Sequence, residues 1–106
     1  MQRGEVFHLP APRRSQGHEQ KGRRYGVVLQ ADDLLALSTV IVAPTSMGAL
    51  PTSFRPVVTV GGKQTRVLVD QLGAVDPARL GRSAGMLTRD DLSAVEYALG
   101  VVLGLP

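Results

Sequence analysis

Arginine and lysine side chains concentrate in one short stretch of this 106-residue chain. Residues 13–24 contain five of the twelve basic side chains and a single carboxylate, Glu19. Arginine offers two parallel N–H donors and a fixed positive charge, which suit a phosphate group or a negatively charged phosphorane. The stretch, together with a formal net charge of +3, therefore predicts an anionic partner.

Two hydroxyl residues, Thr45 and Ser46, directly follow an apolar run, and Arg24 directly precedes another. If the two runs are neighbouring strands, Arg24 and one of the hydroxyls can converge on a single phosphate. An arginine at the start of a strand is held more firmly than one on a mobile loop. The pattern also fits a solvated basic loop beside a Thr-Ser turn, and the residue types alone do not choose between the two.

The chain lacks the residues and motifs that several other enzyme classes need. The chain has no cysteine, which excludes thiolate catalysis and disulfides. Neither of its two histidines, His8 and His18, has a carboxylate cluster at metal-ligand spacing, so we expect no metal and no cofactor. No P-loop, nucleophile elbow or HExxH motif is present. His8 alternates with apolar residues, and we expect it to be structural.

Many short strands must position the candidate residues. Strands are expected over residues 5–9, 25–30, 39–43, 57–60, 64–69, 72–75 and 85–87, helical turns near 31–38 and 76–81, and loops over 10–24 and 44–55. Gly61-Gly62 favours a tight hairpin between two strands. Thr88 with Asp91 predicts a helix start, which an apolar stripe continues to about Val102. We predict a mainly β fold with a C-terminal helix, in one domain over 1–106.

The chain shows no membrane or secretion signal. No apolar run approaches the roughly 18 residues that a spanning helix needs. The first residues lack the apolar segment of a signal peptide. We therefore expect a cytoplasmic protein that does not contact membranes. Because a core of this size is marginal and aliphatic, we also expect a homodimer.

Four segments resemble, in order, the motifs of the MazF/PemK toxin family. GHEQKGRR followed by YGVVLQ (residues 17–30) resembles its G-S-E-Q-x-G-x-R-P-A/V-V-V-L motif. RGEVFHLP (3–10) resembles its R-G-D/E-V-W first strand, and VIVAPTS (40–46) its V-x-x-P-x-T-S/T segment. VLVDQLGAVDPARL (67–80) resembles its V-x-x-D-Q-I-R-T-V-D-x-x-R-L segment. The resemblance covers nearly the whole chain.

The resemblance implies an SH3-like, PemK/MazF-type β-barrel that forms a homodimer and acts as a toxin paired with an antitoxin protein. It further implies a metal-independent, sequence-selective endoribonuclease that cuts single-stranded RNA, including mRNA. In such a reaction the neighbouring 2′-OH is the nucleophile, and the products carry a 2′,3′-cyclic phosphate and a 5′-OH.

The resemblance also implies which residues act. Arg24 and Ser46 would carry catalysis, with Thr45 in place of Ser46 if the register shifts by one residue. Glu19 would orient Arg24, accept the proton of the 2′-OH or form a structural salt bridge. The remaining implied RNA-binding residues come from the basic loop, the following strand and the D-Q pair: Arg13, Arg14, His18, Gln20, Lys21, Arg23, Tyr25, Asp70 and Gln71.

The sequence departs from the family motifs at four positions. His18 replaces Ser, Tyr25 replaces Pro, Ser46 replaces Thr, and Gly73 stands where Arg or Lys is frequent. These departures leave an alternative open, in which a toxin-like barrel binds nucleic acid or a protein without cutting RNA. A purely structural SH3-like domain is the third interpretation.

Overall fold

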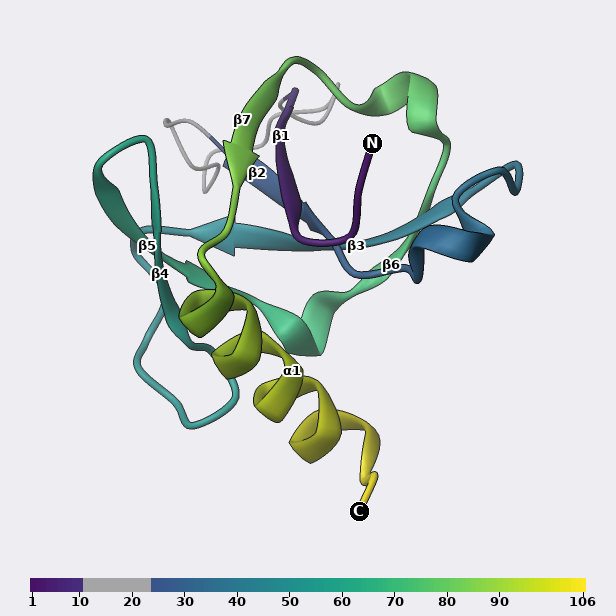
Figure 1. Cartoon of the computed structure of the whole chain (residues 1–106). Helices are drawn as coiled ribbons and strands as arrows, with labels where there is room; N and C mark the ends of the chain where they lie inside the picture. The colour runs from purple at the N-terminus through teal and green to yellow at the C-terminus, as the bar shows by residue number, and fades with distance from the viewer. Residues whose placement is uncertain (11–23) are drawn as a thin grey trace, which may run out of the picture.

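The strands of this protein form one strongly curved, antiparallel sheet (Figure 1). The computed structural model describes residues 1–10 and 24–106. In this part the strand order is β4-β5-β3-β2-β1-β7, and β6 pairs with β3. The strands are β1 (Glu5–Leu9), β2 (Arg24–Val28), β3 (Val40–Ser46), β4 (Val57–Val60), β5 (Lys63–Val67), β6 (Gly73–Val75) and β7 (Ser83–Met86). The helix is α1 (Arg89–Leu103), and the 3-10 turns are η1 (Asp32–Leu34), η2 (Val69–Gln71) and η3 (Pro77–Arg79).

Strand β3 joins the two halves of the sheet. Its first part pairs with β2 and β6, whereas Thr45 and Ser46 pair with Val67 and Arg66 of β5. We predicted that this strand ends at residue 43 and that a loop begins at 44, and that prediction is wrong. Proline and hydroxyl residues indicate a loop locally, but here the ladder to β5 keeps them extended, with the carbonyl of Pro44 accepting from Leu68 N at 2.8 Å.

The hairpin between β4 and β5 forms as predicted. Val60 pairs with Lys63, so the connection has the two residues Gly61 and Gly62. Their φ angles are 58° and 79°, the left-handed region that both central residues of a type I′ turn occupy. Glycine adopts this region without steric cost, which explains the Gly-Gly pair.

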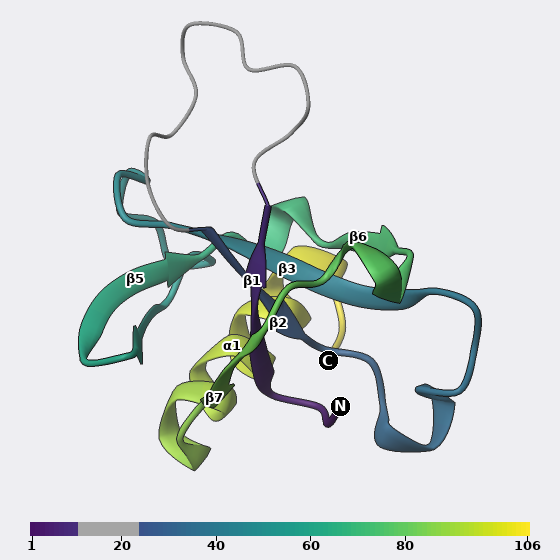
Figure 2. The ribbon, with the colours of Figure 1, turned by 90° about the horizontal axis from the view of Figure 1, so that it is seen from above.

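Helix α1 covers one side of the curved sheet, as the view from above shows (Figure 2). Thr88 caps the helix by accepting a hydrogen bond from Asp91 N at 3.1 Å, as predicted. Its buried residues Val95 and Ala98 join the larger core cluster, which holds the apolar residues of this side of the sheet. A smaller cluster around Val28, Val40 and Val42 lies apart from it. The predicted mainly β fold with a C-terminal helix is confirmed.

Candidate active site

Arg24 is the first residue of β2 and pairs with Leu9 of β1. The residue is half-buried, and its Nε atom has neither exposed surface nor a hydrogen-bond partner among the described residues. A buried N–H group without an acceptor is unfavourable, and the cost is larger for a charged group. Arg24 is therefore placed to gain from an anion that supplies the acceptor.

The register of β2 and β3 distinguishes Ser46 from Thr45. Gly26 pairs with Pro44 and Val28 with Val42, and the same register continued along the strands sets Arg24 opposite Ser46. Directly opposite residues of an antiparallel pair place their side chains on the same face. Ser46 thus lies on the face of Arg24, and Thr45 lies on the other.

Thr45 already has a structural partner. Its Oγ1 accepts a hydrogen bond from the backbone N of Tyr25 at 3.2 Å, and only 1% of the residue is exposed. Ser46 is also buried, at 4% exposure, so contact with a phosphate requires neighbouring side chains to move. The next residue, Met47, is 64% exposed. The continued strand register is thus the observation that groups Ser46, and not Thr45, with Arg24.

Tyr25 and the β4–β5 hairpin enclose a cavity of about 380 Å³. Lys63 and Thr65 of β5 line it, with Met47 at the end of β3. The Tyr25 ring lies 5.0 Å from that of His8, between ring centroids, which supports the expected structural role of His8. The cavity combines an aromatic ring, a cation and an apolar side chain, which are the groups that hold unpaired bases.

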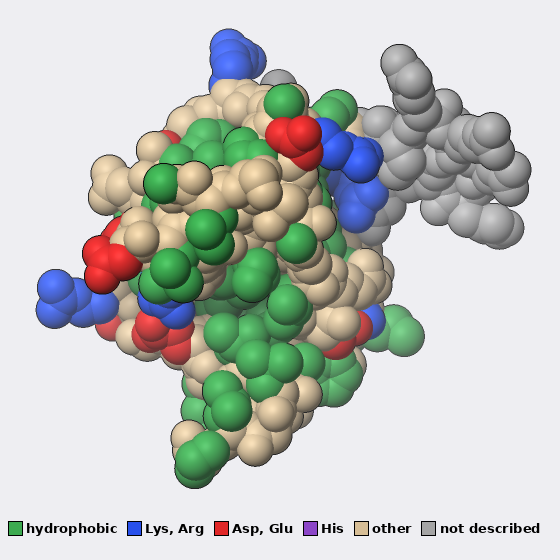
Figure 3. Space-filling view, turned by 90° about the vertical axis from the view of Figure 1, so that its right-hand side faces the viewer, with side chains coloured by type: hydrophobic (Ala, Val, Ile, Leu, Met, Phe, Trp, Pro, Cys, Tyr) green, Lys and Arg blue, Asp and Glu red, His purple; other side chains and the backbone are tan. Residues whose placement is uncertain are grey.

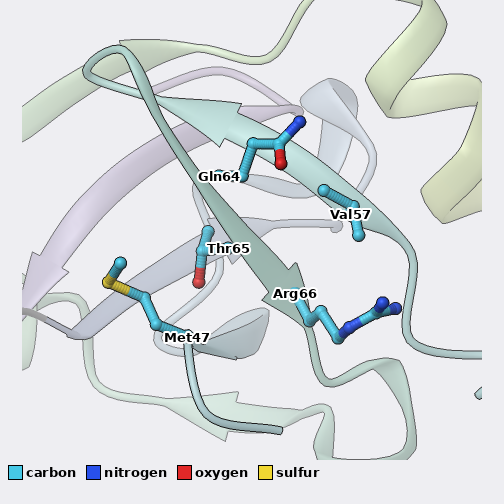
Figure 4. A pocket seen from close by; sticks show the side chains of 5 residues that line it. All are labelled: Met47, Val57, Gln64, Thr65 and Arg66. Atoms are coloured by element: carbon cyan, nitrogen blue, oxygen red, sulfur yellow. The ribbon is translucent and has the colours of Figure 1, made fainter. Parts of the chain in front are cut away.

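A second cavity of about 250 Å³ adjoins the first, with Met47 and Thr65 lining both. Figure 4 shows Met47 and Thr65 on one side of β5, whereas Gln64 and Arg66 extend from the opposite side of that strand. The Thr65 hydroxyl is buried and has no hydrogen-bond partner among the described residues. Met47, Lys63 and Thr65 are not among the residues that the sequence predicts to be functional. The polar run after Gly61-Gly62 is the signal that could have indicated two of them, but by itself it predicts only a hairpin strand.

Asp70, predicted to bind RNA, forms an ion pair with Arg55. The Nε and Nη2 atoms of Arg55 lie 3.0 and 2.8 Å from the two carboxylate oxygens. Hydrogen bonding from Arg55 lowers the pKa of Asp70, and the same bond raises the pKa of Arg55. Arg66 donates to the carbonyl of Arg55 at 2.8 Å. These contacts fasten the 47–56 loop to β5 and η2, while Gln71 at the end of η2 is exposed.

The remaining predicted site residues fall between Pro10 and Arg24, outside the described residues: Arg13, Arg14, His18, Glu19, Gln20, Lys21 and Arg23. Within residues 1–10 and 24–106, no group of three or more His, Asp or Glu side chains is arranged to hold a metal ion. No helix in the described part of the chain is both long and apolar enough to cross a membrane.

Comparisons with known proteins identify relatives over the whole chain. The family model for PemK-like, MazF-like toxins of type II toxin-antitoxin systems matches residues 2–103. A protein of Mycobacterium tuberculosis, named as the candidate toxin Rv3098A, is 40% identical over 104 residues and 97% of each chain. An endoribonuclease solved with its cognate antitoxin, from a mycobacterial species, superimposes with a TM-score of 0.80 at 17% identity, covering 100% of this chain and 97% of that one. MazF from Deinococcus radiodurans has a TM-score of 0.70 at 26% identity, covering 98% and 96%.

Proposed function

The chain belongs to the family of PemK-like, MazF-like toxins of type II toxin-antitoxin systems, and we propose that it is an endoribonuclease that cuts single-stranded RNA. One observation carries the proposal beyond family membership. Arg24 holds a buried N–H at the start of β2 that has no acceptor among the described residues, and the β2–β3 register, continued by two residues, sets it opposite Ser46. A phosphodiester group supplies the missing acceptor and is the group that such a pair of side chains can activate.

In the proposed reaction the 2′-oxygen of the substrate attacks the adjacent phosphorus. The bond from phosphorus to the 5′-oxygen of the next nucleotide breaks, which leaves a 2′,3′-cyclic phosphate and a 5′-OH. The guanidinium of Arg24 stabilises the negative charge of the phosphorane, and the Ser46 hydroxyl donates to one of its oxygens. Because the nucleophile is the substrate's own hydroxyl, this chemistry requires no metal.

Two proton transfers accompany these bond changes. The 2′-OH must lose a proton, and the leaving 5′-oxygen must gain one. An arginine side chain stays protonated in a protein, so it has no lone pair with which to take the proton of the 2′-OH. Arg24 is therefore assigned to charge stabilisation and to a hydrogen bond with the leaving oxygen, which takes its proton from the solvent. Glu19 is proposed to orient Arg24 or to accept the proton of the 2′-OH.

RNA bases are proposed to occupy the two cavities beside β5. Tyr25 offers a stacking surface and Lys63 a cation at the larger one. Gln71 is exposed at the end of η2, and Asp70 holds the 47–56 loop through Arg55. The residues of the basic loop are proposed to bind the RNA backbone. Because the proposed substrate is mRNA, we propose that the protein acts in the cytoplasm.

A cognate antitoxin is the proposed protein partner. Structural relatives were solved as an endoribonuclease with its cognate antitoxin and as MazE-MazF from Deinococcus radiodurans. By analogy, this chain is proposed to bind an acidic antitoxin over its basic site, which would exclude RNA.

A homodimer is also proposed, because α1 and the residues that follow it leave large apolar side chains exposed. Tyr97 is 72% exposed, Leu103 53% and Leu105 60%. Figure 3 shows hydrophobic side chains gathered over the middle and lower part of one face. Sedimentation analysis should give a dimer at micromolar concentration, and a monomer at high micromolar concentration would contradict this assignment.

RNA cleavage in excess EDTA tests the proposed activity. The wild type should cut single-stranded RNA and leave 5′-OH ends, which polynucleotide kinase labels directly. Arg24→Ala should cut at least about 100-fold more slowly while still folding. Arg89→Ala is the matched control, because Arg89 is exposed at the start of α1.

Two outcomes would contradict the proposal. If the wild type binds RNA tightly but cuts none, the chain is a binding module that does not cut. The burial of the Ser46 hydroxyl would be consistent with that result. If Arg24→Ala cuts at the wild-type rate, the site has been assigned to the wrong residue.

A further inference from the structure

We propose that Arg79 is a second phosphate-binding residue, which forms with Arg24 one anion site for a phosphodiester group of RNA. The inference rests on the proposed function. The two arginines line a cavity of about 180 Å³ together with Leu9, Pro10 and Val75. Among the described residues, the lining therefore carries two positive charges, no carboxylate, and otherwise apolar side chains.

The two arginines differ in their surroundings, because Arg24 is half-buried and Arg79 is exposed to solvent. Arg24 Nε is buried without an acceptor among the described residues. No carboxylate within the described ranges forms an ion pair with Arg24 or Arg79. Two like charges at one small cavity repel each other, and an anion placed between them removes that repulsion. The same anion supplies the acceptor that Nε lacks.

Arg79 stands on a segment that the fold holds firmly. The Asp76 side chain accepts from Ala78 N at 2.9 Å, and Arg79 N donates to Asp76 O at 2.9 Å, which closes η3. Leu80 packs on the smaller core cluster, and Gly81 N donates to His8 O at 2.7 Å. A cation on a rigid segment loses little backbone entropy when it binds a ligand.

The size and place of the cavity favour a backbone phosphate. The cavity of about 180 Å³ is much larger than the space that a single water molecule needs, so it has room for a phosphodiester group. Arg24 belongs both to this cavity and to the proposed catalytic pair with Ser46, whereas Ser46 is not among the described residues that line the cavity. Arg79 would thus hold, from the side of η3, a backbone phosphate that Arg24 also contacts.

Salt-dependent binding isolates this contribution from cutting. The probe is a single-stranded 2′-O-methyl RNA, which offers phosphates but no free 2′-OH. Each phosphate contact contributes about 0.7 to the slope of log K against log salt concentration for a single strand. We expect Arg79→Ala to reduce the magnitude of that slope by about 0.7 and to weaken binding at least fivefold in low salt. Arg79→Lys should retain the slope, and Arg89→Ala should match the wild type.

A slope and an affinity for Arg79→Ala equal to those of Arg89→Ala would overturn the inference. So would an Arg79→Ala protein that binds RNA normally but no longer binds an acidic protein partner, since the site would then serve that partner. Thermal unfolding of Arg79→Ala at the wild-type temperature confirms that any loss is local. If the wild type cuts no RNA, the proposed activity fails, but the slope with the uncleavable probe still decides whether Arg79 binds phosphate.

Discussion

Thr45 and Ser46 are adjacent in sequence, but substitution should affect them in opposite ways. Thr45→Val preserves the shape of a side chain that is 1% exposed and removes the acceptor of the 3.2 Å bond from Tyr25 N. A hydrogen bond contributes about 0.5–1.5 kcal/mol net, and leaving a buried donor unpaired costs about 1–3 kcal/mol. Because Tyr25 is only half-buried, we expect a loss of about 1–2 kcal/mol in the free energy of unfolding.

The change is large enough to measure. In a chain of this size 1 kcal/mol shifts the midpoint of thermal unfolding by about 4–8 °C, so Thr45→Val should unfold roughly 5–15 °C below the wild type. RNA cutting, assayed well below that midpoint, should stay within about threefold of the wild-type rate. Ser46→Ala should instead cut about 100-fold more slowly, as expected when one donor to a negatively charged transition state is removed.

Thr45→Ser is the matched control, because it keeps the hydroxyl and should retain most of the stability. If Thr45→Val abolishes cutting while folded and Ser46→Ala cuts normally, the strand register does not determine which hydroxyl acts. Such a result would mean that β3 binds RNA with the face that carries Thr45.

Two further predictions concern stability. The pKa of Asp70 is lowered by Arg55, so the pair stabilises the fold above the unfolded pKa of Asp70, near 4, and this contribution disappears as the pH falls through the lower folded value. The midpoints of thermal unfolding of the wild type and Asp70→Asn should therefore differ at pH 6 and converge near pH 2. An equal difference at both pH values would contradict the expected direction of this pH dependence. Thr88→Ala removes the cap of α1 and should cost about 1 kcal/mol in urea unfolding, whereas Thr88→Ser should cost little; equal losses for both would show that the hydroxyl is not what stabilises the helix start.

Local patterns in the sequence were sufficient to predict several elements of the fold. Gly61-Gly62 specified the two-residue hairpin because only glycine occupies both positive-φ positions without strain. Thr88 specified the start of α1 because its hydroxyl satisfies a backbone N–H three residues later. The position of Arg24 at the start of a strand also followed from the change from polar to apolar residues. Each of these outcomes depends on interactions between residues a few positions apart.

The composition of the site was decided by contacts between distant residues. Strand β3 continues through Ser46 because β5 pairs with it there, and no local property of Pro44 or Thr45 predicts that pairing. The same long-range register separates Ser46 from Thr45, which their order along the chain left open. Arg79 reaches the cavity of Arg24 only because β6 and η3 return across the sheet. The two-residue alternation along a strand tells which side chains share a face, but only the pairing of strands in the folded protein tells which strands contribute to one site.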